Sequence, residues 1–273
     1  SSTGNQSTLL RIRVELAVQK DGSDNEHEIY RIIHTYRAIR EIWDLDAKSN
    51  SLKREVITSK KVTIFSDSIV VSFEVSDKSE VFSTLLEIKW LLMRLINQGI
   101  LCRGAISLGK LIHTDEYIFG PALVEAYTLE SKAAVYPRVI LERSIIEIGA
   151  KYGNPNHSSS EERKYVNDLL EKDSDGMYYV DYFHKAQSEL DDPQYDFPEY
   201  IGKLGEIIRK GLMASSHSSK ADIRVKYAWR RERYNHMIDM VKNKEFIAYL
   251  RNVGDSDLAE FYSQVKKISP DRG

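Results

Sequence analysis

The sequence contains little of what several protein classes require. Its single cysteine, Cys102, excludes an internal disulfide and is compatible with a reducing cytoplasm, and the apolar residues around it favour a small core residue over a nucleophile. The seven histidines are scattered, and no HExxH or CxxC motif indicates a Cys/His metal site. No apolar run approaches the roughly 20 residues that span a bilayer, and the start shows no signal-peptide pattern. We therefore expect a cytoplasmic location and no membrane partner.

An excess of positive charge is also absent. The formal net charge is −2, whereas a general nucleic-acid-binding protein has a basic surface. Arg224, Lys226 and residues 229–233 (WRRER) look like a nucleic-acid patch, but interleaved acids and helical spacing favour an amphipathic helix. A hydrophobic content of 42% with 29% charged residues is ordinary for a globular protein. We expect no nucleic-acid partner.

Apolar spacing predicts the order of the secondary structure. Strands are predicted at residues 9–18, 56–65, 69–75, 101–112, 117–119 and 139–141. Helices are predicted at residues 28–43, 79–98, 122–134 and 142–148, where Gly99 is typical of a helix end and Pro121 of a helix start. The order β-α-β-β-α-β-β-α-β predicts an α+β core related to the ferredoxin-like plan.

The pattern changes after residue 149. Helices are predicted at residues 161–172, 198–215, 220–242 and 244–265, with an edge strand at residues 177–183. We therefore expect a first domain at residues 9–149 and a mainly helical C-terminal extension packed on it at residues 150–273.

Residues 61–73 (KVTIFSDSIVVSF) place three polar residues inside an apolar run. This pattern predicts a tight hairpin with the carboxylate of Asp67 at its tip. Such a carboxylate needs a partner, since burying it bare is very costly. A divalent cation that carries a nucleoside triphosphate is one such partner. A simple hairpin cap is the other interpretation, because Asp is common in turns.

A second stretch, residues 103–130, carries further motifs. It contains an arginine-led strand that ends in glycine (RGAISLG, residues 103–109), followed by a helix that begins with Gly120-Pro121 and includes Ala126, Leu129 and Glu130. Together with FSDSIVV, this stretch resembles the catalytic domain of class III nucleotidyl cyclases. The resemblance covers residues 9–148 and implies a class III cyclase core in which two carboxylates hold two Mn²⁺ or Mg²⁺ ions.

The resemblance also implies roles for individual residues. Asp67 matches the metal-binding aspartate of the hairpin, with Ser68 beside it. The other metal-binding aspartate has no equivalent, and Glu15 is the carboxylate nearest to its position. The asparagine and arginine that stabilise the transition state in adenylyl cyclases fall on Val124 and Thr128. We therefore assign orientation to Glu125, and charge stabilisation to Arg103 and Arg138, with Lys110 as a further candidate.

The base-reading positions differ from those of adenylyl cyclases. The lysine and aspartate that read adenine align with Thr63 and Tyr117, and Phe65 and Ser66 complete the expected substrate-binding set. A smaller pyrimidine base held by an aromatic side chain is a reasonable substitute for adenine read by a lysine and an aspartate. The variant pattern, including Tyr136-Pro137-Arg138, resembles the pyrimidine cyclases of bacterial Pycsar anti-phage systems. This implies that UTP or CTP is converted to cUMP or cCMP by a head-to-tail homodimer, and that the product activates a separate effector.

Two other function classes remain open from the residues. A catalytically inactive relative that binds a nucleotide as a regulatory module would keep much of the same pattern. A palm-type polymerase or diguanylate-cyclase relative would be expected to carry a GG(D/E)EF signature, which the chain lacks.

Overall fold

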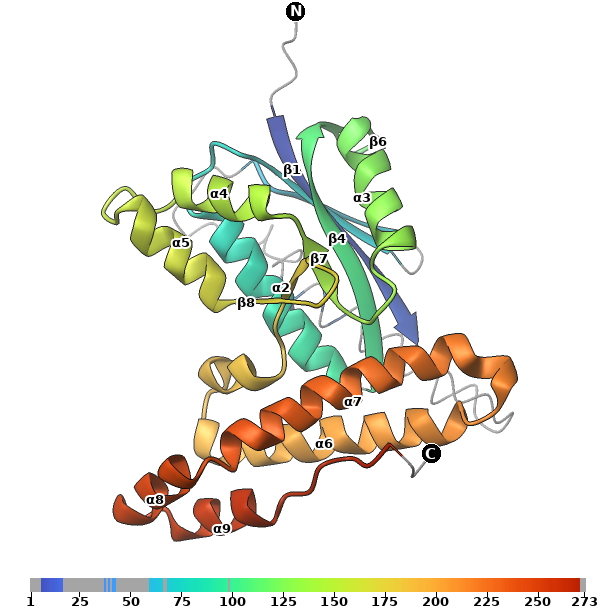
Figure 1. Cartoon of the computed structure of the whole chain (residues 1–273). Helices are drawn as coiled ribbons and strands as arrows, with labels where there is room; N and C mark the ends of the chain where they lie inside the picture. Colours follow the sequence, from blue (N-terminus) through green and yellow to red (C-terminus); the bar gives the residue numbers. More distant parts are fainter. Residues whose placement is uncertain are drawn as a thin grey trace, which may run out of the picture. The chain divides into compact units, whose positions relative to one another are not determined.

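The computed structural model (Figure 1) describes residues 6–16, 37, 39, 41–42, 59–65, 68–97 and 99–270. The chain divides into two compact units, the first ending at Val180 and the second beginning at Asp181. This division lies later than the boundary expected at residue 149, because two further strands join the sheet after that point.

The first unit contains most of the strands. In chain order its elements are β1 (Gln6–Leu16), β2 (Lys61–Phe65), β3 (Ser68–Glu74), α2 (Glu80–Asn97), β4 (Ile100–Lys110), β5 (Ile112–His113), β6 (Ile118–Phe119), α3 (Pro121–Lys132), β7 (Val139–Leu141), α4 (Arg143–Lys151), α5 (Ser159–Asp168), β8 (Leu170–Lys172) and β9 (Tyr178–Val180). Of the helix predicted at residues 28–43, only 37, 39 and 41–42 lie within the described residues, and these are helical.

The main sheet has the strand order β2-β3-β1-β4-β7-β9-β8. β3 lies between β1 and β2 and is antiparallel to both, while β1 lies between β3 and β4 and is antiparallel to both. β3 therefore separates β1 from β2, and β1 separates β3 from β4. This is the ferredoxin-like arrangement. β7 then pairs with β4 in parallel through α3. The predicted α+β class with its central sheet is confirmed.

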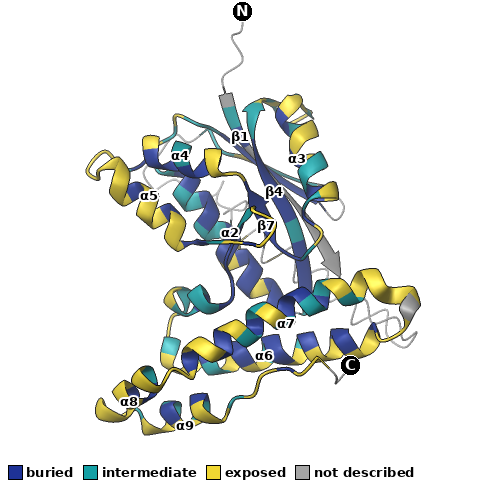
Figure 2. Cartoon of the chain, viewed as in Figure 1, coloured by how far each residue is buried: buried dark blue, intermediate teal, exposed yellow. Residues whose placement is uncertain are grey.

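Helices cover both faces of the central strands. α3 packs on β1 and β4, and its Ala122 and Ala126 contact Val70 of β3. α2 contacts β4 and α4, with an apolar face that includes Val81, Leu85 and Ile88. All six residues from Ser68 to Phe73 are buried, as expected for a strand covered on both faces. Most of β4 is buried as well, with intermediate positions between (Figure 2).

The region after α4 differs from the sequence prediction. The helix predicted at residues 161–172 starts earlier, because Ser158 and Glu161 form a capping box before its first turn. It also ends earlier, at Asp168. Leu170 then pairs with Val180 in a β8–β9 hairpin. β9 pairs with β7, which makes these residues part of the sheet.

The second unit is helical, as predicted for the C-terminal region. It contains two short 3₁₀ helices, η2 (His184–Glu189) and η3 (Ser218–Lys220), and the helices α6 (Pro193–Ala214), α7 (Ala221–Val241), α8 (Lys244–Asn252) and α9 (Ser256–Gln264). A Cβ atom on Gly205 or Gly211 of α6 would collide with the rings of Tyr234 and Tyr227 of α7, respectively. The glycines therefore allow the two helices to pack closely. No helix among the described residues is long and apolar enough to cross a bilayer.

Candidate functional site

The strand register lines up several predicted site residues at one end of the sheet. Phe65 pairs with Ser68 across the β2–β3 hairpin, Ser68 pairs with Arg13 of β1, and Arg13 pairs with Arg103 of β4. β1 continues beyond this row, where the backbone of Glu15 pairs with that of Leu101. The backbone at position 15 and the facing ends of β2 and β3, at Phe65 and Ser68, therefore lie at the same end of the sheet.

The predicted metal ligands are only partly within the described residues. Ser66 and Asp67 lie outside them, as do the side chains of Glu15 and Phe65. Ser68 is described and is 3% exposed. The metal roles of these residues and the substrate roles of Phe65 and Ser66 stay predictions, while the backbone register agrees with a shared location.

Arg103 lies in this row and forms a partly buried ion pair. Its Nε lies 2.8 Å from Oε1 of Glu130, near the end of α3, and the Glu130 side chain is only 1% exposed. A buried carboxylate requires a charged partner, and the arginine meets that need. Arg103 thus places a positive charge at the hairpin end of the sheet, and its ion pair with Glu130 of α3 fixes the position of that charge.

Thr63 belongs to a polar cluster that the sequence did not reveal. Its Oγ1 lies 2.8 Å from Nε2 of His113, whose Nδ1 lies 2.6 Å from Oγ of the buried Ser72. Burial lowers the pKa of His113, the positive charge of Lys61 lowers it further, and Asp115 acts in the opposite direction. The neutral ring therefore donates through one nitrogen and accepts through the other, which links β5 to the β2–β3 hairpin.

Tyr117 and Glu125 lie away from the hairpin row. Tyr117 is exposed in the turn between β5 and β6, with its ring 5.7 Å from that of Phe119. Glu125 lines a hollow of about 150 Å³ together with Ser107, Glu142 and Ser144. Ser107 is four residues along β4 from Arg103, a distance of about 13 Å. Within one chain, Glu125 and Arg103 are therefore not brought together.

Arg138 does not have the exposed position that a phosphate contact requires. Its side chain is fully buried, and its Nη1 and Nη2 form ion pairs with Asp173 and Asp175 in the β8–β9 turn. The guanidinium also lies 5.1 Å from the ring of Tyr136. Acidic partners that come 35 and 37 residues later thus enclose the guanidinium, and the catalytic role of Arg138 stays a prediction.

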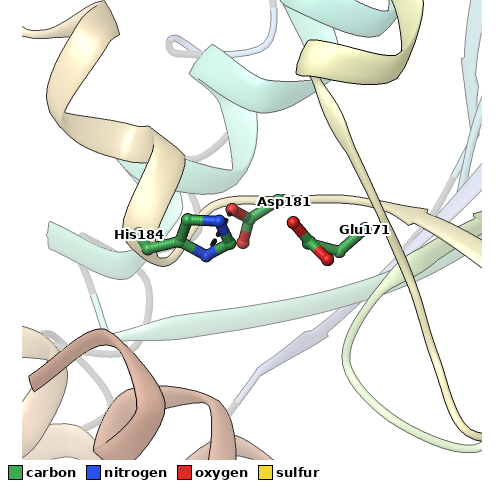
Figure 3. A group of neighbouring side chains, drawn as sticks. All are labelled: Glu171, Asp181 and His184. Atoms are coloured by element: carbon green, nitrogen blue, oxygen red, sulfur yellow. Dashed lines mark ion pairs between the residues drawn. The ribbon is translucent and has the colours of Figure 1, made fainter. Parts of the chain in front are cut away.

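Asp181 and His184 form an acid–imidazole pair in the second unit. His184 Nδ1 lies 3.1 Å from Oδ2 of the fully buried Asp181, as the dashed line in Figure 3 marks. Asp181 also accepts hydrogen bonds from the backbone N–H groups of Phe183 and Lys185. Figure 3 draws them with Glu171 of β8, which belongs to the first unit. Aspartate and histidine, the two members of this pair, are residue types that bind divalent cations.

Sequence reasoning therefore missed two residues of the candidate site. Glu130 was noted as part of the helix motif, but its pairing with Arg103 depends on how α3 packs on the sheet. His113 carried no signal, because nothing in its local sequence indicates that it lies against β2 and β3. A carboxylate on the buried side of α3, four residues after Ala126, is the one signal that could have identified Glu130.

Comparisons with known proteins show little likeness in sequence. No family model matches the chain, and no curated protein matches it. Among solved structures, the chain is similar to the adenylyl cyclase CyaB from P. aeruginosa, with 11% identity and a TM-score of 0.38. The match covers 65% of this chain and 94% of that chain. The assignment of the fold therefore rests on the strand order and pairing described above.

Proposed function

We propose that the protein is a metal-dependent nucleotide cyclase that converts UTP or CTP to the 3′,5′-cyclic monophosphate and pyrophosphate. The observation that carries the proposal is the register that aligns the β2–β3 hairpin, the end of β1 and Arg103 at one end of the sheet. The cyclase-like motifs at residues 65–71 and 103–130 fall on β2–β3 and on β4–α3, respectively.

The residues expected to hold two Mn²⁺ or Mg²⁺ ions are Asp67 and Glu15, with Ser68 beside them. The donor set fits, because carboxylates are ligands that these hard cations prefer. The register supports the proposal, since the backbone at position 15 and the facing ends of β2 and β3, at Phe65 and Ser68, are at the same end of the sheet. When bound, the ions would lower the barrier to attack by the ribose 3′-hydroxyl and neutralise charge on the triphosphate.

The side chains of the chain would bind and orient the nucleotide. Arg103 would supply positive charge at the end of the sheet where the phosphates lie, with Glu130 fixing its position. Thr63, held by His113, would contact the base through its hydroxyl group. Glu125 is exposed and distant from the hairpin row, and Tyr117 is exposed in the β5–β6 turn, so we assign both to the site of the partner in a head-to-tail homodimer.

The biological role follows from the resemblance to pyrimidine cyclases. We propose that the cyclic nucleotide serves as a second messenger in anti-phage defence and activates a separate effector. The location that this role requires is the bacterial cytoplasm.

One observation favours a second candidate, a cyclase-like module that binds a nucleotide without converting it. Both arginines assigned to charge stabilisation form ion pairs with acidic residues, which reduces the positive charge offered to a triphosphate. Binding of UTP or CTP without release of pyrophosphate would distinguish this candidate from the enzyme.

The proposal is tested by incubating the chain with each of the four nucleoside triphosphates and Mn²⁺ and measuring pyrophosphate. We expect release from UTP or CTP, and its loss in Asp67→Ala and after chelation of the metal. Asp168→Ala is a matched control, since Asp168 is exposed at the end of α5, away from these residues in the sequence. Absence of pyrophosphate release with all four nucleotides would contradict the proposal.

A further inference from the structure

The α6–α7 hairpin has a far end that begins next to a close contact between the two helices. Gly211 of α6 lies against the ring of Tyr227 of α7, so the two helices are in close contact at that level. Residues 209–226, here called the α6–α7 tip, contain the end of α6, the connecting η3 helix and the start of α7. The tip belongs entirely to the second unit.

The tip concentrates positive charge in a chain of net negative charge. It contains five basic residues and one acidic residue, Asp222, whereas the whole chain has a formal charge of −2. The basic residues are Arg209, Lys210, Lys220, Arg224 and Lys226. Lys210 pairs with Glu206, but both side chains are about 60% exposed, so this pair contributes little and exchanges readily.

Apolar side chains are exposed among these charges. Met213 is 65% exposed, Val225 46% and Ile223 40%. Met213 lies two residues past Gly211 on α6, while Ile223 and Val225 lie just before Tyr227 on α7. The tip therefore presents apolar groups from both helices, next to a basic surface and a connection rich in serine.

We propose that the α6–α7 tip binds the surface of a membrane that contains anionic lipids. Lys and Arg side chains are attracted to anionic headgroups, and exposed aliphatic side chains at the end of a hairpin can enter the boundary with the acyl chains. Charge complementarity alone would also allow a nucleic acid. However, the tip has no Phe, Tyr or Trp on which bases could stack. Aliphatic groups beside basic groups suit a lipid surface better.

This inference revises the expectation that the chain has no membrane partner. That expectation rested on the absence of an apolar run long enough to span a bilayer, which does not exclude binding to the surface. The inference does not depend on the proposed cyclase activity, since vesicle binding requires no nucleotide. Either proposal can therefore fail without the other.

The test is sedimentation of the full chain with large vesicles of phosphatidylcholine alone or of phosphatidylcholine with phosphatidylserine. We expect binding only to the anionic vesicles, and its loss at high salt because the Debye length shortens. Lys210→Gln with Lys220→Gln should weaken binding at least about 30-fold. Lys244→Gln with Lys266→Gln is the matched control, since both lysines are exposed in the same unit outside the tip.

A second pair of variants tests the apolar part. Met213→Gln with Ile223→Gln should weaken vesicle binding about tenfold or more, whereas Tyr195→Gln with Tyr249→Gln, which are also exposed in this unit, should leave it unchanged. Far-UV circular dichroism confirms that each variant is folded. Three results would overturn the proposal: no binding of the native chain to anionic vesicles, equal losses in tip and control variants, or tip-dependent binding to an oligonucleotide but not to vesicles.

Discussion

Arg103 and Arg138 lie at adjacent places in the sheet and have different surroundings. Arg103 is on β4 and Arg138 immediately precedes β7, and the backbone N–H of Gly104 donates to the carbonyl of Arg138. Arg138 is fully buried between two aspartates of the β8–β9 turn. Arg103 keeps 15% of its side chain exposed and has Glu130 as an acidic partner. The first arginine is thus suited to bind a ligand, and the second joins two parts of the fold.

The largest expected effect is the loss of stability in Arg138→Met. Removing the guanidinium leaves Asp173 buried without its charged partner, so the free energy of unfolding should fall by about 3–5 kcal/mol. Denaturant unfolding measures this, with Arg143→Met as the control because Arg143 is 76% exposed. A loss for Arg138→Met as small as that of the control would contradict the structural role.

Substitution of Arg103 should separate function from stability. Arg103→Gln alone strands the buried Glu130 and should lower the free energy of unfolding by about 3 kcal/mol. The double variant Arg103→Gln with Glu130→Gln removes both charges and should recover most of that loss. Pyrophosphate release by the double variant should still fall about 100-fold or more. Release at the native rate would show that Arg103 has the same structural role as Arg138.

Acidification should destabilise the first unit through His113. Because burial and Lys61 hold the pKa of His113 below 6.5, its neutral form stabilises the fold above pH 6.5, and this contribution is lost as pH falls through the lowered pKa. We expect the free energy of unfolding to decrease below pH 6.5 more in the native chain than in His113→Gln. Identical pH dependences in the two proteins would contradict the role of His113.

Asp175→Asn should have the smallest effect. Burial opposes ionisation of Asp175, but the hydrogen bonds that it accepts from Arg138 and from the backbone N–H of Met177, together with the positive charge of Arg138, outweigh burial and keep the pKa of this carboxyl below its usual value. Its side chain is nevertheless 42% exposed, so the loss should be about 1 kcal/mol or less. Asp173→Asn, at a side chain only 2% exposed, should cost clearly more in the same unfolding experiment. Equal losses would show that both carboxylates are equally important for Arg138.

The sequence predicted the parts of the fold that depend on local pattern. The apolar spacing of α2 and the glycine after it were sufficient to predict that helix, and Gly99 does adopt a positive φ of 69°. The β2–β3 hairpin could be predicted because polar residues interrupt an apolar run. β8 could not be predicted, because it follows almost directly on a helix and its partner in the sheet, Val180, lies ten residues further along the chain.

The candidate site was less predictable because its contacts join distant segments. Arg138 looks like a surface charge until the turn at Asp173 and Asp175 is in place. His113 reaches Thr63 and Ser72 from positions 50 and 41 residues away, respectively. Local spacing carries no information about such pairs.

The most direct test of the central claim is the identity of the product formed from UTP and CTP with Mn²⁺, determined by mass spectrometry. The proposed function predicts a 3′,5′-cyclic monophosphate from one of these nucleotides and equimolar pyrophosphate, with neither formed by Asp67→Asn. A linear monophosphate, or the same product from native chain and variant, would contradict the assignment of a cyclase site at the β2–β3 hairpin.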